Sequence, residues 1–410
     1  MRRREFLGAA AALSGLTLIP VGRQAWAARN PAGAQRRLVV VFLRGAVDGL
    51  NVVIPYTDHN YYAMRPTIAV ARPGQKDGAL DLDGRFGIHP QLAPLMPLWT
   101  ERSLAFVHAC GSPDESRSHF EAQAYMETGT PGVKTTTDGW LNRTLAALPG
   151  PRSSTEAVNF GPTMPRILHG TMPVASLPSA GGGGHPAAEL AKPAIHSAFD
   201  EMYSGTDTLS VAYREGQSAQ ARLMSDLEQD MSEAGGGAPS PRGFAEDVGH
   251  FCKLARKDPT IEMGFFALSG WDTHVRQGAA DGQLASHLRG LGQGLAAFRS
   301  GLGDQYGSTV ILVMSEFGRT AHENGNAGTD HGHGNAMWVM GGPVAGGKVY
   351  GDWPGLAAEH LHEDRDLAIT TDFRTVASAV LSGHLKLPPS AMAAIFPKAP
   401  GGKAVPILHA

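Results

Sequence analysis

Short apolar runs recur along the chain and predict strands that are covered on both faces of a sheet. These runs span Leu38 to Leu43, Leu104 to Ala109, Glu262 to Leu268, Thr309 to Met314 and Ala336 to Met340. Segments with helical spacing span Trp140 to Leu148, Leu284 to Leu302 and Phe373 to Leu381, and another helix begins after Ser118. Because strands alternate with helices, the pattern predicts an α/β fold with a central, mainly parallel sheet and helices on both faces.

Polar side chains suited to metal or acid-base chemistry follow the four strongest apolar runs. In chain order they are Asp48; Ser118 and His119; Asp272 and His274; and Glu316 with His331 and His333. Because the carboxyl ends of parallel strands open into one crevice, we expect these side chains to converge on one site. Residues two apart in an extended segment point the same way, so Asp272 and His274 can face one ion, as can His331 and His333. Carboxylate oxygen and imidazole nitrogen together suit zinc, manganese or iron better than calcium.

Two of these positions also have a structural interpretation near a turn or a helix start. Asp48 precedes a glycine, and that pairing often only makes a turn. Ser118 stands three residues before Glu121, which is the capping-box spacing of a helix start. Capping is compatible with a nucleophilic serine only if the hydroxyl also faces the site.

The late stretch has structural alternatives as well. Glu316 could serve as an ion-pair partner for Arg319, and His331 and His333 could face solvent in their glycine-rich loop. Two histidines that follow an acidic strand end favour the functional interpretation. By contrast, His89, His322 and His384 stand alone, and we interpret them as surface or core histidines.

The first 27 residues have the pattern of an export signal. Arg3 and Arg4 form a twin-arginine pattern, a mildly apolar run extends from Gly8 to Pro20, and Ala25-Trp26-Ala27 is a small-x-small cleavage site. The alternative is a membrane anchor, but the apolar run is too short and too rich in glycine and alanine to favour one. We therefore expect export by the twin-arginine translocation machinery, a periplasmic or extracellular protein, and no stable membrane span after cleavage.

The mature chain, residues 28–410, is predicted to be a single domain with an insertion. Glycine-rich breaks at Gly181 to Gly184 and Gly235 to Arg242 flank a stretch with helical spacing. We interpret the residues near 185–240 as a helical insertion or lid on that domain.

Composition narrows the classes of partner. Of the 410 residues, 42% are hydrophobic and 18% are charged, so the chain can bury a large core. A formal net charge of -3 with mixed signs offers no basic face, which argues against nucleic acid as a partner. Cys110 and Cys252 fit two buried thiols better than a structural disulfide.

Several motifs, taken in order, resemble the domain of unknown function 1501 family. They are RGAVDGLN from Arg44, SRSHFEAQ from Ser116, GWDTH from Gly270, SEFGRT from Ser315, DHGHGNAMWVMGG from Asp330 and TTDFR from Thr370. The resemblance extends along nearly the whole mature chain. It implies a twin-arginine-exported bacterial protein with an alkaline-phosphatase-like three-layer sandwich, related in fold to alkaline phosphatases and sulfatases.

The resemblance also implies roles for individual residues. In that superfamily two metal ions lie at the strand carboxyl ends, and a serine, threonine or modified cysteine attacks phosphorus or sulfur. By motif order, Asp48 matches the first-strand metal ligand and Ser118 the region of the nucleophile. Asp272 and His274 resemble the ligand pair of one metal, and His331 or His333 resembles the late histidine.

One departure from the superfamily pattern concerns the second metal. Active members carry an Asp-His pair after the fourth strand, whereas this chain has Glu316-Phe317. An apolar ring therefore replaces one ligand, and the chain is expected to hold one ion or a reorganised pair.

These observations lead to two functional hypotheses. The first is a metal-dependent hydrolase of small phosphate or sulfate esters that uses zinc or manganese, with Ser118 or a water as nucleophile. Arg44 or Arg319 would help to hold the anion, and Glu316 or His119 would act as general acid-base groups. The alternative is an exported metal- or glycan-binding protein that kept the fold and lost the chemistry.

Overall fold

A computed structural model describes residues 35–150, 155–179, 234–399 and 405–409 of the protein. Residues Gln35–Ala410 form one compact unit. The predicted signal peptide, residues 1–27, and most of the helical insertion predicted near 185–240 lie outside the described residues. Within the described ranges, no helix is long and apolar enough to cross a membrane.

Among the described residues, a mixed sheet of nine strands forms the centre of the unit. The strands are β1 (Arg37–Leu43), β5 (Leu104–Gly111), β6 (Ala157–Phe160), β7 (Ala175–Leu177), β8 (Met263–Leu268), β9 (Thr309–Ser315), β10 (Asn335–Gly341), β11 (Lys348–Tyr350) and β14 (Thr371–Asp372). Their order is β11-β5-β10-β9-β1-β8-β6-β7, and β14 pairs with β5 outside this path. Strand β10 runs antiparallel to β5 and β9, and the other pairs are parallel. The predicted mainly parallel sheet is confirmed.

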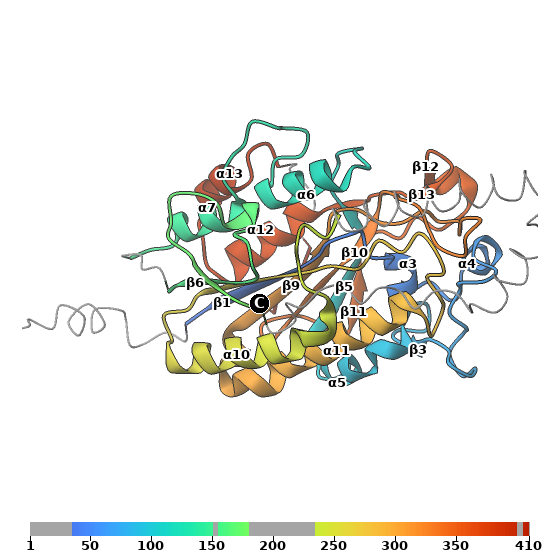
Figure 1. Ribbon diagram of the computed structural model, residues 1–410, viewed down its shortest axis with the longest axis horizontal. Coiled ribbons are helices and arrows are strands. Elements are labelled where there is room, and N and C mark those ends of the chain that lie inside the picture. The colour runs from blue at the N-terminus through green and yellow to red at the C-terminus, as the bar shows by residue number, and fades with distance from the viewer. Residues whose placement is uncertain (1–34, 151–154, 180–233, 400–404, 410) are drawn as a thin grey trace, which may run out of the picture. The chain divides into compact units, whose positions relative to one another are not determined.

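Helices cover both faces of this sheet (Figure 1). On one face lie α5 (Met96–Thr100), α10 (Phe244–Lys257) and α11 (Gln283–Leu302), and on the other lie α6 (His119–Thr128), α7 (Trp140–Ala147), α12 (Phe373–Gly383) and α13 (Pro389–Ile395). The central strand β1 contributes alternate side chains to the two cores, with Val39 and Val41 in one and Val40 and Phe42 in the other. Because both faces are covered, β1 has an unbroken apolar sequence.

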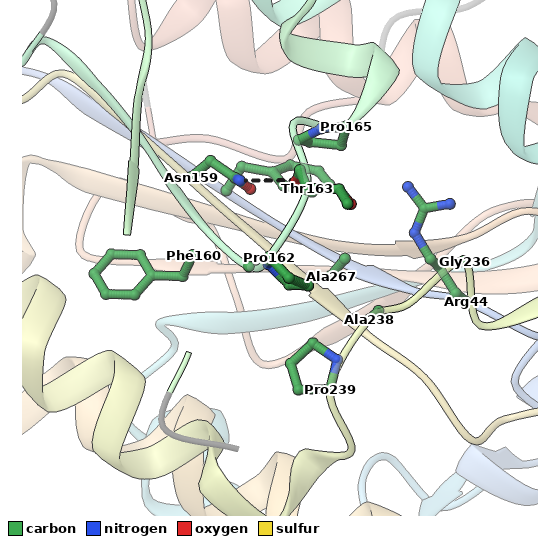
Figure 2. Close-up of a pocket in the computed structure, with 12 residues that line it drawn as sticks. Arg44, Asn159, Phe160, Pro162, Thr163, Pro165, Gly236, Ala238, Pro239 and Ala267 are labelled. Atoms are coloured by element: carbon green, nitrogen blue, oxygen red, sulfur yellow. Dashed lines mark hydrogen bonds between the residues drawn. The ribbon is translucent and has the colours of Figure 1, made fainter. Parts of the chain in front are cut away.

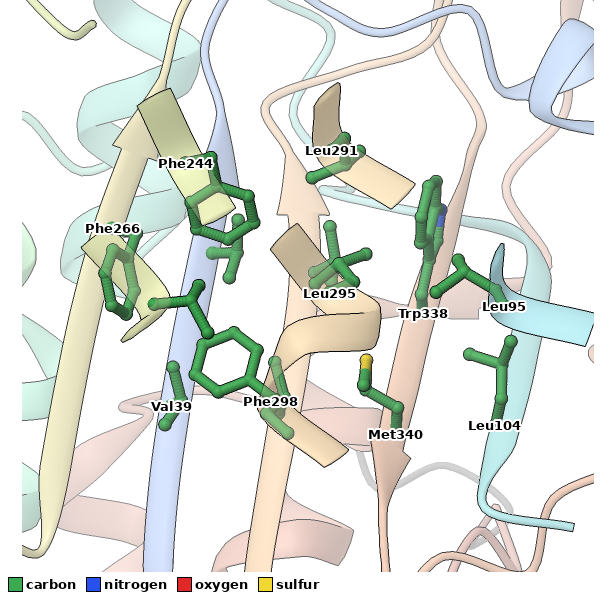
Figure 3. Packing of buried hydrophobic residues seen from close by; sticks show 14 of the residues in the cluster. Val39, Leu95, Leu104, Phe244, Phe266, Leu291, Leu295, Phe298, Trp338 and Met340 are labelled. Atoms are coloured by element: carbon green, nitrogen blue, oxygen red, sulfur yellow. The ribbon is translucent and has the colours of Figure 1, made fainter. Parts of the chain in front are cut away.

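The packing of α11 shows why its sequence has helical spacing. Leu291, Leu295 and Phe298 lie on one face of this helix and are completely buried. Figure 3 shows them facing the sheet, where Trp338 and Met340 of β10 belong to the same hydrophobic cluster. This contact anchors α11 over the strands whose ends carry the polar residues.

Shorter elements complete the described parts of the chain. They are α3 (Gly49–Val52), α4 (His59–Met64), the small sheet β2 (Val53–Ile54), β3 (Leu80–Asp81) and β4 (Gly87–Ile88), the hairpin β12 (Leu361–His362) and β13 (Asp366–Leu367), and the 3-10 helices η1 (Pro90–Leu95), η2 (Arg166–Leu168), η3 (Pro241–Gly243), η4 (Gly303–Ser308) and η5 (Ala358–His360). Cys110 and Cys252 are both buried and free, as the preference for two buried thiols predicted.

The five predicted strands are present close to their predicted ends, whereas several other elements were not predicted. Strands β6 and β7 have only four and three residues, which is too short for a clear alternation of apolar and polar side chains. Helix α10 was also missed, although Phe244, Val248, Phe251 and Ala255 repeat at helical spacing and are buried. The sequence therefore contained a signal for α10 that our prediction did not use.

Candidate metal centre

Three side chains from distant parts of the chain meet at the carboxyl edge of the sheet. His119 begins α6 after β5, Asp272 follows β8, and His331 lies in the loop between β9 and β10. Nε2 of His119 is 2.9 Å from Nε2 of His331 and 3.4 Å from Oδ2 of Asp272. Nε2 of His331 is 3.4 Å from Oδ1 of Asp272. One ligand atom from each residue lies within 4.8 Å of the others, which is close enough to hold one metal ion.

His274 brings a third imidazole to this group. Its Nε2 is 2.9 Å from Oδ1 of Asp272 and 3.0 Å from Nε2 of His331. We call these four residues, His119, Asp272, His274 and His331, the His/Asp cluster. Two ligand atoms on a tetrahedral zinc with bonds of about 2.0 Å are roughly 3.3 Å apart. The separations of 2.9 to 3.4 Å between neighbouring members of the His/Asp cluster are similar. Among the described residues, the group whose ligand atoms all lie within 4.8 Å of one another is His119, Asp272 and His331.

The second ring nitrogen of each histidine faces a hydrogen-bond acceptor outside the cluster. Nδ1 of His274 is 3.2 Å from Oδ1 of Asp330, and Nδ1 of His331 is 2.8 Å from the main-chain oxygen of Arg117. We infer from these acceptors that the ring proton is on Nδ1 and that the Nε2 lone pair faces into the cluster. Metal-binding histidines have this arrangement, because donation from the other nitrogen fixes the tautomer and the ring orientation.

Glu316 gives His119 the corresponding support. Its Oε1 lies 2.8 Å from Nδ1 of His119 and accepts hydrogen bonds from the main-chain N–H of Gly45 at 2.8 Å and from Nε2 of Gln123 at 2.9 Å. The Ser315 hydroxyl is 3.0 Å from Oε2. Burial opposes ionisation of Glu316, but its hydrogen bond and charge interaction with His119 and the Gln123 bond outweigh burial and lower its pKa. Glu316 is therefore an enclosed, ionised partner of His119.

Asp272 offers an oxygen atom that suits a cation. Nη1 of Arg319 donates to Oδ1, whereas Oδ2 is buried and has no hydrogen-bond partner among the described residues. Burial would raise the pKa of Asp272, but its interactions with His119, His274 and His331 and the charge of Arg319 hold it well below its usual value. An ionised oxygen that has no hydrogen-bond partner in the described parts of the chain and lies 3.4 Å from Nε2 of His119 fits a divalent ion of the zinc or manganese type.

In the ion-free protein a proton can balance this charge. Burial lowers the pKa of His119, but hydrogen bonds with Asp272 and Glu316 outweigh that effect and raise the pKa to about 9. A protonated His119 and a bound cation serve the same electrostatic need, so proton and metal compete for this position.

The structure does not bring Asp48 into the His/Asp cluster. Oδ2 of Asp48 forms an ion pair with Nη1 of Arg65 at 2.6 Å, and both side chains are completely buried. Nε2 of Gln277 donates to the same oxygen at 2.6 Å. The charge of Asp48 is therefore balanced by a fixed guanidinium.

His333 also lies apart from the cluster. Its ring stacks on that of His362, with 4.3 Å between the ring centroids. Burial and the neighbouring charges of His362 and Arg117 lower the pKa of His333 to about 4. Of the two histidines predicted to face one ion, only His331 belongs to the His/Asp cluster.

The start of α6 differs from the predicted capping box. Ser118 is the N-cap residue, but its side chain makes no capping hydrogen bond. Glu121 instead accepts a hydrogen bond from the Ser116 hydroxyl at 3.0 Å and pairs with Lys134. The capping-box prediction is therefore wrong, and Ser118 stands exposed beside His119.

The two arginines predicted to hold an anion both form bonds with side chains that surround the site. Arg319 has a completely buried side chain that bonds to Asp272. The guanidinium of Arg44 bonds to Gln123 and Glu127. Arg44 also borders a small pocket of about 20 Å³ at the ends of β6 and β8 (Figure 2). Both guanidiniums are thus committed to neighbouring side chains.

Sequence reasoning missed three groups that orient the histidines. Gln123 lies four residues after His119 on α6, and that spacing places both on one helix face. Asp330 directly precedes His331, so its position was a usable signal. Arg117 acts through its main-chain oxygen, which no side-chain pattern reveals.

The chain belongs to the family described as protein of unknown function (DUF1501), which matches residues 35–396. The resemblance seen in the sequence is confirmed. No curated protein matches the chain.

Several solved structures share low sequence identity and limited structural similarity with this chain. One is a protein in the alkaline phosphatase superfamily from Vibrio parahaemolyticus, with 9% identity, a TM-score of 0.38 and coverage of 78% of this chain and 63% of that chain. This chain thus spans less than two thirds of the Vibrio protein. A 2-O GAG sulfatase has 10% identity, a TM-score of 0.39 and coverage of 91% and 76%. The C-terminal periplasmic domain of EcEptC from Escherichia coli, in complex with Zn, has 8% identity, a TM-score of 0.35 and coverage of 76% and 74%.

Proposed function

We propose that the protein is an exported, metal-dependent hydrolase of small phosphate or sulfate esters. The observation that carries this proposal is the group of His119, Asp272 and His331, whose ligand atoms lie within 4.8 Å of one another. Nε2 of His274 lies beside this group, 3.0 Å from Nε2 of His331. Three imidazoles and a carboxylate favour zinc, with manganese as the alternative. One ion per chain fits better than two, because Arg65 already balances the charge of Asp48.

A divalent ion held by the His/Asp cluster would polarise an ester oxygen and lower the pKa of an attacking hydroxyl or water. Ser118 is our candidate nucleophile, because it is exposed, directly precedes His119 and makes no capping hydrogen bond. We assign His119 as a ligand, since both of its ring nitrogens have partners. We assign Glu316 the role of orienting the His119 ring. Its carboxylate is enclosed and cannot reach a proton of the substrate.

The proposed location rests on the first 27 residues. Their twin-arginine pattern and small-x-small cleavage site support export to the periplasm or the cell exterior. The twin-arginine route carries folded proteins, so the His/Asp cluster could load its ion before export.

A second candidate is a non-catalytic, exported metal- or glycan-binding protein. With His274 as a fourth ligand beside His119, Asp272 and His331, protein groups would fill the coordination of a tetrahedral ion, and such closed sites are typical of structural zinc. In addition, the apolar ring of Phe317 packs on the cluster, with centroids 4.9 Å from His119 and 5.2 Å from His331. Both observations favour a protein that binds a metal ion and does not hydrolyse a substrate.

Metal analysis of purified protein tests the metal centre. The wild type should carry about one zinc or manganese per chain, and Asp272→Ala and His274→Ala should lose most of it. His333→Ala is the matched control, because its ring stacks on His362 outside the cluster. Equally little metal in the wild type and in the cluster variants would contradict the proposal.

A substrate panel separates the two candidate functions. Aryl phosphates, phosphodiesters and aryl sulfates should be supplied to zinc- and manganese-loaded protein, with Ser118→Ala as the comparison. Turnover of one class that Asp272→Ala abolishes would support the hydrolase. A metal-loaded protein with no turnover of any class would favour the binding protein.

A further inference from the structure

Arg117 lies at the rim of the His/Asp cluster. Its main-chain oxygen accepts the hydrogen bond from Nδ1 of His331 at 2.8 Å, and it precedes Ser118 and His119 directly in the chain. The Arg117 side chain is 34% exposed, unlike those of Arg44 and Arg319, which are 12% and 0% exposed. The main chain of Arg117 thus lies beside the cluster, and solvent can reach its side chain.

The Arg117 guanidinium retains hydrogen-bonding capacity. Nη2 bonds to Oε2 of Glu363 at 2.5 Å and to Oδ2 of Asp366 at 2.8 Å. Nε of Arg117 and Oδ1 of Asp366 are buried and have no hydrogen-bond partner among the described residues. A guanidinium has five N–H donors in a planar fork, and this fork matches two oxygens of a phosphate or sulfate group.

The two carboxylates that bind Arg117 differ in how firmly they are held. Asp366 has a completely buried side chain, whereas that of Glu363 is 54% exposed. Glu363 sits at the tip of the β12–β13 hairpin, which lies near α6 at the upper right of Figure 1. An exposed ion pair contributes little to stability, so another anion can replace Glu363 on Arg117.

The hairpin turn places Glu363 opposite Arg117 in a backbone conformation that glutamate rarely adopts. Glu363 and Asp364 have φ values of 53° and 52°, and the N–H of Arg365 bonds to the main-chain oxygen of His362 at 3.1 Å. Strand pairing of His362 with Asp366 leaves three residues in the loop, and two successive positive φ values favour asparagine, aspartate or glycine over glutamate. The turn itself does not explain a glutamate at this position.

Arg365 adds a second guanidinium on the same side of the site. Its Nη2 donates to the main-chain oxygen of His331 at 2.7 Å, and its Nε is 3.7 Å from Oδ1 of Asp366. The side chain is 38% exposed. Two partly exposed guanidiniums therefore share Asp366 as a common anchor, and that of Arg365 also bonds to the backbone of His331.

We propose that Arg117, assisted by Arg365, binds the tetrahedral oxyanion of the substrate and that Glu363 occupies Arg117 until the substrate displaces it. This assignment rests on the proposed ester hydrolase and names the residues that recognise its anionic group. The buried carboxylate of Asp366 positions both guanidiniums. Phosphate and sulfate share this chemistry, and the charge and binding strength of the two ions distinguish them in the experiment.

Calorimetric titration with inorganic phosphate and, separately, sulfate tests the proposal. Arg117→Gln should weaken binding of the preferred ion by about tenfold or more, since a charge-assisted hydrogen bond is lost. Glu363→Asn should strengthen binding several-fold, because it removes the competing carboxylate. Asp364→Asn is the matched control, because it removes the same charge from the same exposed turn, and its affinity should stay at the wild-type value.

Each titration is run on zinc-loaded and on metal-free protein, with metal content and thermal unfolding measured in parallel. Arg117→Lys serves as a second variant that keeps the charge and loses the fork, and its affinity should lie between wild type and Arg117→Gln. Unchanged affinity in Arg117→Gln, or equal effects of Glu363→Asn and Asp364→Asn, would overturn the proposal. A wild type that binds zinc but neither anion would overturn it as well. A wild type that binds an anion through Arg117 but holds no metal would contradict the proposed hydrolase instead.

Discussion

Nδ1 of His119 lies 2.8 Å from Oε1 of Glu316, and Nε2 of the same ring lies 2.9 Å from Nε2 of His331. One imidazole thus links an enclosed carboxylate to the His/Asp cluster. The carboxylate orients the ring and makes Nε2 a better electron donor, as it does behind the histidine ligands of metal sites. This relationship assigns Glu316 a supporting position rather than a place in proton transfer to a substrate.

Glu316→Gln should lower zinc affinity by about 10- to 100-fold, because the charge that supports His119 is lost. The fold should tolerate this change, since the amide oxygen can keep the bonds from His119, Gly45 and Gln123 while the amide nitrogen donates to Ser315. Competition with a chromogenic chelator measures the affinity. Wild-type zinc affinity together with a large loss of thermal stability would show a purely structural glutamate.

Removal of the metal should destabilise the protein. An ion that binds only the folded state stabilises it by about 2.7 kcal/mol when its free concentration is about 100 times Kd. Thermal unfolding with and without a chelator should therefore show a lower Tm for the stripped wild type. His333→Ala should show the same difference, and Asp272→Ala should show almost none.

Asp48→Asn should lower the free energy of unfolding and leave the metal content unchanged. The substitution leaves the Arg65 guanidinium completely buried without its counter-ion, and such a change costs about 3 kcal/mol or more. Urea unfolding measures the loss, and metal analysis should still find about one ion per chain. A variant that loses its metal but keeps its stability would show that Asp48 is a ligand.

Acid should destabilise the fold through buried histidines such as His108. Burial lowers the pKa of His108 from 6.5 to about 4, and both ring nitrogens already have main-chain partners in Val53 and Ala109. As pH falls from about 6.5 to about 4, His108 becomes protonated in the unfolded chain but stays neutral in the folded chain. The free energy of unfolding therefore falls by up to about 3 kcal/mol. Above that range the contribution is fully present.

Urea unfolding at a series of pH values tests this prediction. His108→Gln should have a shallower loss of stability between pH 6.5 and 4 than the wild type. His322→Gln is the control, because His322 is exposed, and its pH dependence should match that of the wild type. Identical curves for His108→Gln and wild type would contradict the prediction.

The sequence located the ends of the strands that build the site. The buried runs of β1, β5, β8 and β9 are mostly apolar because helices cover both faces. The polar residues that follow them had to lie at one edge of a mainly parallel sheet. The spacing of Asp272 and His274 also predicted that both could face one ion. These features depend on local pattern, so they can be read without a structure.

Tertiary packing decided which of the candidate residues meet. Asp48 and Asp272 both follow strand ends, both pair with a buried guanidinium, and both keep an oxygen without a hydrogen-bond partner among the described residues. Only Asp272, however, lies beside the imidazoles of His119 and His274. His331 and His333 have the same spacing as Asp272 and His274, yet His333 stacks on His362 of the β12–β13 hairpin. Arg65 and His362 lie far from these residues in the sequence, and no local pattern reveals such partners. The sequence by itself therefore determined the sheet, its covered strands and the edge where the chemistry gathers. Only the three-dimensional fold decided which carboxylates and imidazoles share that edge, because their partners are set by contacts between distant segments.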